Sequence, residues 1–441
     1  MSTGGRPGAI LVGLLALAVV VVLAFNMGRG GGDPSGGDPT GSAQVTPSES
    51  GAVGVTASPH PSGPAESAAT DEEALAVLME VEAQVEAIRG LPPAEIGAPE
   101  LITRDELREE LQAIFDEEYP PEERDRDNRS LRAFGLLTPD EDVAELQLQL
   151  LGDGVLGFYD DIERRMVVVT DSGLDAVAKL TYAHEYTHAL QDAAFGLATL
   201  ETDAVGEDDR GLARTALIEG DANTTMLAWA FGHLTQAEIL ELQDMPIPDT
   251  SGVPFWMVAQ LEFPYTFGQA WVAHLVGQDM AAPDFAEVNA AFADPPSSTE
   301  QIIELDAWDA REEPIPVELP DLADALGEGW EAVDSSPVGQ ATIAIILEFF
   351  EVPVVDAREA ARGWGGDRAT VASGAAGEFA LAWRLAWDSP ADAGQFVDAY
   401  QAVLAGLAFE ASVRELPDGQ VLVVHASSGA VHDATVAAAG G

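Results

Sequence analysis

The chain has 441 residues, of which 47% are hydrophobic, enough to form the cores of two folded domains. Its 76 acidic and 20 basic residues give a formal net charge of −56, a field that repels nucleic acid and excludes it as a partner. The sequence has no cysteine, so disulfides and thiolate chemistry are excluded, and a metal ion could be bound only through histidine and carboxylate side chains.

The N-terminal segment contains a long apolar run. Residues 9–25 read AILVGLLALAVVVVLAF and follow Arg6, a pattern typical of a segment that inserts into a membrane. We predict that residues 1–27 are an N-terminal membrane anchor or signal. An uncleaved signal anchor is favoured, which would make the chain a single-pass membrane protein with its catalytic body outside the cytoplasm. Secretion after signal cleavage is the alternative.

A tether and two helices are predicted next. Residues 28–70 are dominated by Gly, Ser, Pro, Thr and Ala and contain no aromatic residue, which predicts a disordered Gly/Ser/Pro-rich tether. A helix begins at Asp71 with DEEALAVLMEVEAQVEAIRG, where acidic residues come first and apolar residues recur at three- and four-residue spacing. A second helix is predicted over residues 103–118. We expect both helices to pack on the domain that follows.

A β-hairpin precedes the most informative helix. Between residues 154 and 170, the strand-like segments VLGFYD and MVVVT flank the polar turn DIERR. The helix that follows reads DAVAKLTYAHEYTHALQDAAFG. Its predicted cap is Asp171 or Ser172, and its predicted end is near Gly196.

The remaining elements fall into two groups. Helices are predicted at residues 210–232, 234–243, 264–278 and 285–305, with the Pro-rich break DMPIPDTSGVPF between the second and third. Beyond about residue 330 the pattern changes, and residues 331–441 are predicted to form a small α+β domain. Its expected elements are a helix near 338–350, a turn at GWGGDR, strands at ATVAS and FALAWRLAWD, a helix at 390–406 and a final strand at QVLVVHA.

The segment HEYTH carries the clearest chemical signal in the chain. His184 and His188 are four residues apart, so on a helix both imidazoles can point at one metal ion. Glu185 lies about 100° further round the helix, where its carboxylate can act on a water molecule without being a ligand. This pattern predicts a metal site in which Glu185 is the general base for peptide hydrolysis.

A third protein ligand has to come from another part of the chain. The metzincin pattern fails, because Gln191 and Ala194 occupy the positions where that pattern needs glycine and histidine. Downstream, the apolar segment LARTALIEGDANTTMLAWAFG carries Glu219 and Asp221 in its middle. Buried charges need a partner, and a metal ion supplies one, so Glu219 is the predicted third ligand.

These segments resemble the gluzincin arrangement of thermolysin-like peptidases, in which two histidines and a glutamate from the next helix bind zinc. The stretch with GFYDDIERRMVVV, HEYTHALQD, ALIEGDA, FPYTFG and PPSSTEQI is similar to a poorly characterised family of predicted bacterial zinc metallopeptidases. The resemblance covers residues 145–305. It implies an α+β fold with a zincin-like, mainly helical catalytic domain over residues 71–330, which contains a small β-sheet.

The resemblance also assigns roles to residues. It implies Zn²⁺ as the cofactor, with His184, His188 and Glu219 as its ligands and Glu185 as the base. Three residues could donate a hydrogen bond to the oxyanion that forms on the substrate carbonyl: Tyr265, His233 and His274. The resemblance favours Tyr265. Asn223 stands where thermolysin-like enzymes have an aspartate that supports a ligand histidine, with Asp221 as the candidate replacement. The resemblance also suggests the strand MVVVT as the edge on which an extended peptide substrate would pair, with a role as a strand of the core sheet as the alternative.

Two other functions stay open at this point. The first is a non-catalytic cell-surface binding or assembly protein with a structural zinc site, which would need a fourth protein ligand such as Asp221 or His233. The second is a protein that binds several Ca²⁺ ions, although the sequence contains no EF-hand or RTX-type loop. The favoured hypothesis is a zinc-dependent endopeptidase that acts on peptide or protein substrates outside the cytoplasm.

Overall fold

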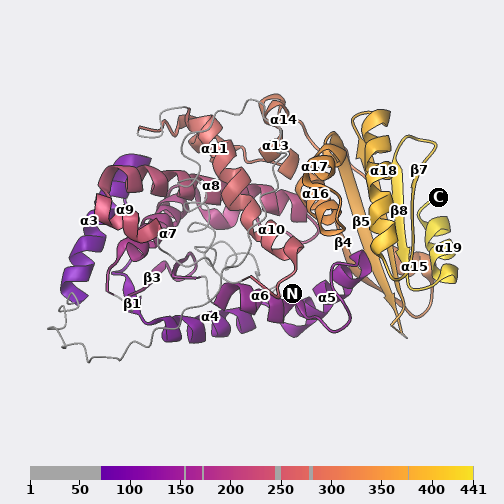
Figure 1. The fold of residues 1–441 in the computed structure, drawn as a ribbon, viewed down its shortest axis with the longest axis horizontal. Helices are drawn as coiled ribbons and strands as arrows, with labels where there is room; N and C mark the ends of the chain where they lie inside the picture. The colour runs from indigo at the N-terminus through magenta and orange to yellow at the C-terminus, as the bar shows by residue number, and fades with distance from the viewer. Residues whose placement is uncertain are drawn as a thin grey trace, which may run out of the picture.

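The computed structural model describes residues 71–152, 155–170, 173–243, 250–277, 282–375 and 377–440. The fold is α+β, with helices in the majority and strands in two separate sheets (Figure 1). The first part of the chain forms the helices α3 (Asp71–Arg89), α4 (Arg104–Glu118), α5 (Pro121–Phe134), α6 (Val143–Gly152), α7 (Ala176–Phe195), α8 (Asp208–His233), α9 (Gln236–Gln243), α10 (Phe255–Phe263), α11 (Gln269–Val276), α12 (Ala286–Ala293), α13 (Thr299–Ile303) and α14 (Leu305–Ala310).

The predicted membrane anchor or signal, residues 1–27, and the predicted tether, residues 28–70, lie outside the described residues. Of the helices that the structure describes, none combines the length and the apolar character that a bilayer crossing requires. The two longest, α7 and α8, carry charged residues in their middle turns, whereas a spanning helix needs about 20 predominantly apolar residues. This finding contradicts the predicted transmembrane helix, signal anchor and single-pass membrane location.

The first sheet lies beside α7 and contains the predicted hairpin. Its strands β1 (Glu100–Ile102), β2 (Gly157–Asp160) and β3 (Arg165–Val169) follow the order β1-β3-β2, with β3 parallel to β1 and antiparallel to β2. Alternate residues of β3 face opposite sides: Val167 packs with α4 and Val168 with α7. Because β3 is the central strand, the prediction that MVVVT forms the edge is wrong; β2 is the edge strand nearest α7.

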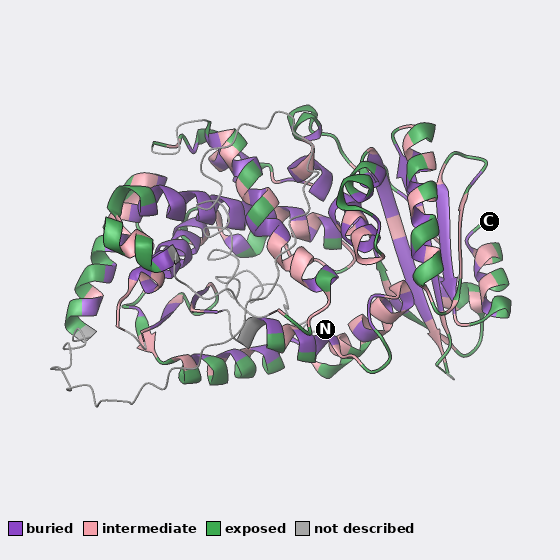
Figure 2. Cartoon of the chain, in the orientation of Figure 1, coloured by how far each residue is buried: buried purple, intermediate pink, exposed green. Residues whose placement is uncertain are grey.

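Helices α7 and α8 form the buried centre of this part of the molecule (Figure 2). The N-terminus of α7 is capped by Asp175, whose side chain accepts a hydrogen bond from the Ala178 N–H at 2.9 Å. Asp171 and Ser172, the predicted caps, lie outside the described residues. The helix ends at Gly196, which adopts a φ of 70° that favours glycine and so terminates the helix where predicted.

Helix α3 packs across α7 and α8 and is joined to them by side-chain hydrogen bonds. The hydroxyls of Tyr182 and Tyr186 on α7 donate to Glu82 and Glu86, respectively. The position of α3 on the helices that follow agrees with the expectation that the first helix packs against them.

The C-terminal part contains five strands and five helices among the residues that the structure describes. The strands are β4 (Trp330–Ser336), β5 (Trp364–Gly374), β6 (Phe379–Trp387), β7 (Glu410–Glu415) and β8 (Val421–Ala426); the helices are α15 (Leu322–Leu326), α16 (Gly339–Phe349), α17 (Val354–Ala361), α18 (Pro390–Gly406) and α19 (Gly429–Ala438). The sheet is antiparallel throughout, in the order β4-β5-β6-β8-β7. On β6, Ala380 and Ala382 face α15 and α19, whereas Leu381 and Trp383 face α16 and α18.

The turn predicted at GWGGDR is wrong, because all of these residues except the first, Gly363, form the first half of strand β5. Gly366 explains the difference. A Cβ atom at this position would lie 2.3 Å from the carbonyl oxygen of Ile315, and the Ile315 N–H donates to the Gly365 carbonyl at 2.6 Å. The two glycines therefore let the segment around Ile315 pass close to the strand.

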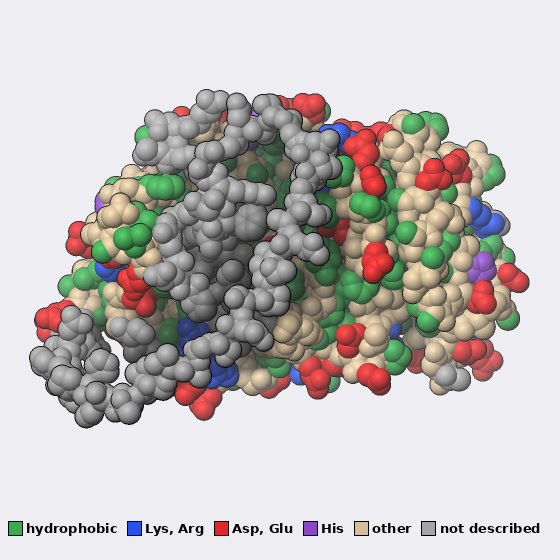
Figure 3. All heavy atoms as spheres, in the orientation of Figure 1, with side chains coloured by type: hydrophobic (Ala, Val, Ile, Leu, Met, Phe, Trp, Pro, Cys, Tyr) green, Lys and Arg blue, Asp and Glu red, His purple; other side chains and the backbone are tan. Residues whose placement is uncertain are grey.

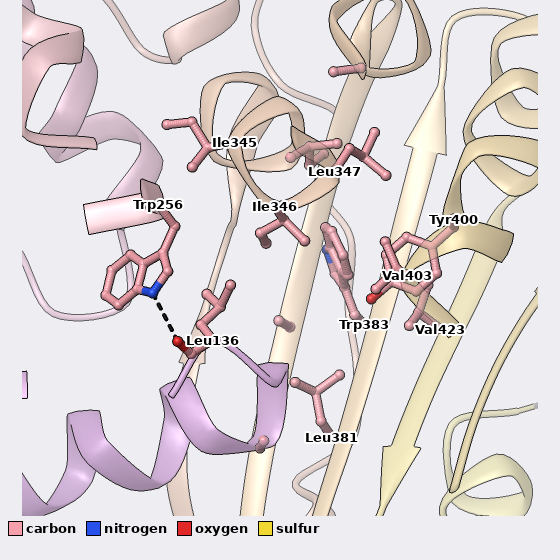
Figure 4. Close-up of a cluster of buried hydrophobic side chains, with 14 of the residues drawn as sticks. Leu136, Trp256, Ile345, Ile346, Leu347, Leu381, Trp383, Tyr400, Val403 and Val423 are labelled. Atoms are coloured by element: carbon pink, nitrogen blue, oxygen red, sulfur yellow. Dashed lines mark hydrogen bonds between the residues drawn. The ribbon is translucent and has the colours of Figure 1, made fainter. Parts of the chain in front are cut away.

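One hydrophobic core extends from the early helices into the C-terminal sheet. Leu136, which follows α5, and Trp256 on α10 are buried in the same cluster as Trp383, Tyr400 and Val423 (Figure 4). The indole N–H of Trp256 donates to the Leu136 carbonyl at 2.9 Å.

Acidic side chains are scattered over the visible surface of both parts (Figure 3).

Candidate metal centre

Three of the predicted side chains meet between α7 and α8. His184 Nε2 lies 3.1 Å from Glu219 Oε2 and 3.1 Å from His188 Nε2, and the remaining separation, between His188 Nε2 and Glu219 Oε2, is 3.5 Å. Ligand atoms about 2.0–2.1 Å from a tetrahedral metal ion are about 3.3–3.4 Å apart. The buried group of His184, His188 and Glu219 could therefore hold a metal ion.

The unpaired polar atoms around these residues also fit a cation. Glu219 Oε1 and the Tyr265 hydroxyl are buried and have no hydrogen bond of regular geometry among the described residues, although the two side chains lie close enough to affect each other's charge. Buried polar atoms in proteins are normally paired, and the two imidazoles cannot both donate to each other along one nitrogen–nitrogen contact. A cation with its own water molecules would satisfy these groups.

Charge–charge interactions within the group are strong because solvent is excluded. Burial favours the neutral form of His188, but the nearby Glu219 carboxylate outweighs it and raises the pKa of His188 to about 9. Burial opposes ionisation of Glu219, yet His188 keeps the pKa of that carboxyl below its ordinary value. Burial lowers the pKa of His184. The two imidazoles and the carboxylate thus stabilise one positive charge between them. A bound metal ion would take the place of that charge.

Glu185 lies next to the three residues but is not one of them. Its side chain is 1% exposed, and its Oε2 accepts a hydrogen bond from the Tyr159 N–H at 3.0 Å. Burial, with a contribution from Glu219, raises the pKa of Glu185 to about 8. The bond from β2 fixes the orientation of the carboxylate and shows that Tyr159, which the sequence did not single out, shapes the site.

Tyr265 reaches the site from a π-helical turn, η2 (Pro264–Gly268), which divides the helix predicted over 264–278. Its ring stacks on His184 with centroids 6.1 Å apart. Burial raises the pKa of Tyr265 well above its ordinary value, and the carboxylates of Glu219 and Glu185 add to this effect. The hydroxyl therefore remains protonated at neutral pH and can donate a hydrogen bond.

Two glycines bring η2 close enough to place Tyr265 there. A Cβ atom on Gly220 would lie 2.3 Å from the Gly268 carbonyl oxygen, and a Cβ atom on Gly268 would lie 2.2 Å from the Ala216 carbonyl oxygen. The backbones of α8 and η2 can approach this closely only because neither residue has a side chain. The π-turn, a type of element that is frequent at functional sites, then points the tyrosine toward His184.

The other candidates from the sequence lie elsewhere. His233 and His274 are exposed and do not join the metal group. Asp221 is buried in an ion pair with Arg89. Asn223 lies beside His184, where contact with its side chain acts to raise the pKa of that histidine, although neither His184 Nδ1 nor Asn223 Oδ1 has a hydrogen bond of regular geometry among the described residues.

Comparison with known proteins concerns only the C-terminal part. The sequence model of a family described as a domain of unknown function (DUF8575) matches residues 327–439. This span runs from just before β4 through α19 and does not include the metal centre. No curated protein and no solved structure matches the chain.

Proposed function

We propose that this protein is a zinc-dependent peptidase of the gluzincin type with a zincin-like catalytic domain. The observation that supports it best is the triangle of ligand atoms from His184, His188 and Glu219, whose sides of 3.1, 3.1 and 3.5 Å match a tetrahedral site. Two nitrogen donors and one carboxylate oxygen suit Zn²⁺. Three protein ligands leave one position for water or substrate, as catalytic zinc sites do.

The neighbouring residues have the properties that peptide hydrolysis requires. When bound, Zn²⁺ would act as a Lewis acid that acidifies water and polarises the substrate carbonyl. Glu185, oriented by the Tyr159 N–H, takes the proton from the attacking water and transfers it to the leaving amine. With a dication bound nearby, Glu185 would be ionised at neutral pH and able to accept this proton. The Tyr265 hydroxyl donates a hydrogen bond to the oxyanion that develops on the carbonyl.

Strand β2 supports a peptide as the substrate. It is an edge of its sheet, and Tyr159 on this edge is directly bonded to Glu185. An extended peptide that paired with such an edge would run past the general base with its scissile carbonyl near the metal centre.

The test uses the full-length chain and the variant Glu185→Gln. We expect the purified protein to bind about one zinc ion per chain and to cleave an unstructured polypeptide, with activity abolished by a chelator and restored by zinc. Glu185→Gln keeps the shape of the side chain but cannot accept a proton, so zinc content should be unchanged while turnover falls at least about 100-fold.

A matched control separates loss of the base from loss of a buried carboxyl. Glu300 is 5% exposed and, like Glu185, has a pKa that burial raises to about 8, but it is not part of the metal group. Glu300→Gln should retain turnover. Undiminished turnover in Glu185→Gln would falsify the mechanism, and a chain that binds zinc without cleaving any polypeptide would support a structural zinc site instead.

A further inference from the structure

A chain of buried hydrogen bonds connects His188 to a residue on α3, a helix that carries no metal ligand. His188 Nδ1 lies 2.9 Å from Gln191 Oε1. Gln191 Nε2 donates to Asp221 Oδ2 at 2.8 Å. Arg89 Nε donates to both carboxylate oxygens of Asp221, at 2.8 and 3.0 Å. Three helices, α7, α8 and α3, thus contribute to one continuous path.

The bonds of Gln191 determine which nitrogen of His188 carries a proton. Its amide nitrogen donates both to Asp221 and to the Ile218 carbonyl, the latter at 3.0 Å. Both amide hydrogens are therefore used, and the amide oxygen must face His188. An oxygen can only accept, so His188 Nδ1 must donate, and in the neutral imidazole that binds a metal ion the lone pair is then on Nε2, the atom that faces His184 and Glu219.

Arg89 holds the Asp221 side chain in position in a place that water does not reach. The side chains of both residues are fully buried, and the guanidinium group lies 4.5 Å from the ring centroid of Phe285 and 5.9 Å from that of Phe195. The two bonds from Arg89 Nε hold the Asp221 carboxylate where Oδ2 accepts from Gln191 Nε2. Without Arg89, Asp221 would be a buried carboxylate with no cation to hold it in place, and the orientation of the Gln191 amide toward His188 would no longer be fixed.

We propose that Arg89, Asp221 and Gln191 are positioning residues that fix His188 in its metal-binding tautomer, so that docking of α3 controls the metal affinity of the site. This inference rests on the metal-binding part of the proposed function. It gives α3 a role beyond packing. Removing the positive charge of Arg89, the last residue of α3, should weaken metal binding at His188 Nε2, although α3 itself carries no metal ligand.

The first test measures zinc affinity by competition with a chromogenic chelator, in the full-length chain. Arg89→Met retains an apolar stem between Phe195 and Phe285 but removes the charge. Gln191→Leu removes the bond to His188 without leaving a buried charge, and so guards against misfolding in the arginine variant. Each should raise the zinc dissociation constant by about 10- to 100-fold. The double variant should lose about as much as either single variant, because both act through one path.

Two further measurements distinguish positioning from general loosening of α3. Val85 is fully buried on the same helix, one turn before Arg89, and Val85→Ala should lower thermal stability while leaving zinc affinity unchanged. In cobalt-loaded protein, the visible ligand-field spectrum should change in Arg89→Met and Gln191→Leu but not in Val85→Ala.

The outcomes separate this inference from the function on which it rests. If the unaltered chain binds no zinc, the metal centre itself is refuted. If it binds zinc and both Arg89→Met and Gln191→Leu bind it equally well, the positioning role is refuted while the metal centre stands. Equal weakening in Val85→Ala would likewise overturn the positioning role, since loss of packing alone would then be sufficient.

Discussion

The backbones of α8 and η2 lie so close together at Gly220 that an added side-chain atom there should push them apart. In Gly220→Ala, the new Cβ atom would lie 2.3 Å from the Gly268 carbonyl oxygen and 2.4 Å from its carbonyl carbon. These are backbone atoms, which cannot rotate away as a side chain would. Ordinary contact begins at 3.4 Å, so η2 must move outward by about 1 Å, and Tyr265 moves with it.

Two opposing effects set the change in stability. Overpacking of this kind costs about 1–3 kcal/mol, and a clash with backbone atoms belongs at the upper end. Alanine improves helix propensity by up to about 1 kcal/mol. We therefore expect the free energy of unfolding of Gly220→Ala to fall by about 2 kcal/mol. Displacement of the hydroxyl by about 1 Å should also reduce kcat by about 100-fold.

The same helix provides the control. A Cβ atom on Gly232 would meet nothing within 4 Å, so Gly232→Ala should leave kcat unchanged and stability equal or slightly higher. Urea unfolding and steady-state peptide hydrolysis would be measured for both variants. If Gly220→Ala matched Gly232→Ala in both measurements, the tight contact would not be what holds Tyr265 in place.

Three further predictions concern pH and metal. Burial raises the pKa of Asp209 to about 7, so the stability that protonated Asp209 contributes is present below about pH 4 and is lost as the pH rises through 7. Between pH 5 and pH 8, the free energy of unfolding measured in urea should therefore decrease less in Asp209→Asn than in the unaltered chain. Burial lowers the pKa of His425 to about 4, so the stability that neutral His425 contributes is present above about pH 6.5 and is lost as the pH falls through 4. In His425→Gln, the free energy of unfolding should therefore fall less steeply as the pH is lowered from 6.5 to 4. An unchanged pH dependence would contradict this prediction. Free zinc at about 1,000 times its dissociation constant should stabilise the full-length chain by about 4 kcal/mol, and calorimetry of His184→Ala should show no such gain.

Local signals in the sequence located several elements well. The helix predicted at 390–406 is α18 (Pro390–Gly406), because Ser389 caps it and proline occupies its first position. The spacing of His184 and His188 placed both on one helical face. Glu219 was identified as a carboxylate within an apolar helix, and the structure places it beside both histidines.

Signals that depend on distant partners were missed. Strand β1 has three residues and pairs with β3 across more than 60 residues of chain, so no local period revealed that MVVVT is a central strand. Arg89 meets Asp221 across 132 residues. Its one sequence signal is a basic residue that closes an otherwise acidic helix, which is equally typical of an ordinary helix end.

The shared core around Leu136, Trp256 and Trp383 limits how the C-terminal segment could be exchanged between proteins. The family match begins at residue 327, yet part of one face of that sheet is covered by α5, which comes some 200 positions earlier in the chain, and α10 covers α16. A gene fusion that transferred only the matched segment would keep α16 and α18 on this face but would expose the apolar side chains that α5 and α10 cover. Any other protein that carries the segment must supply its own substitute for α5 and α10, and that covering element is where its relatives should differ most from this chain.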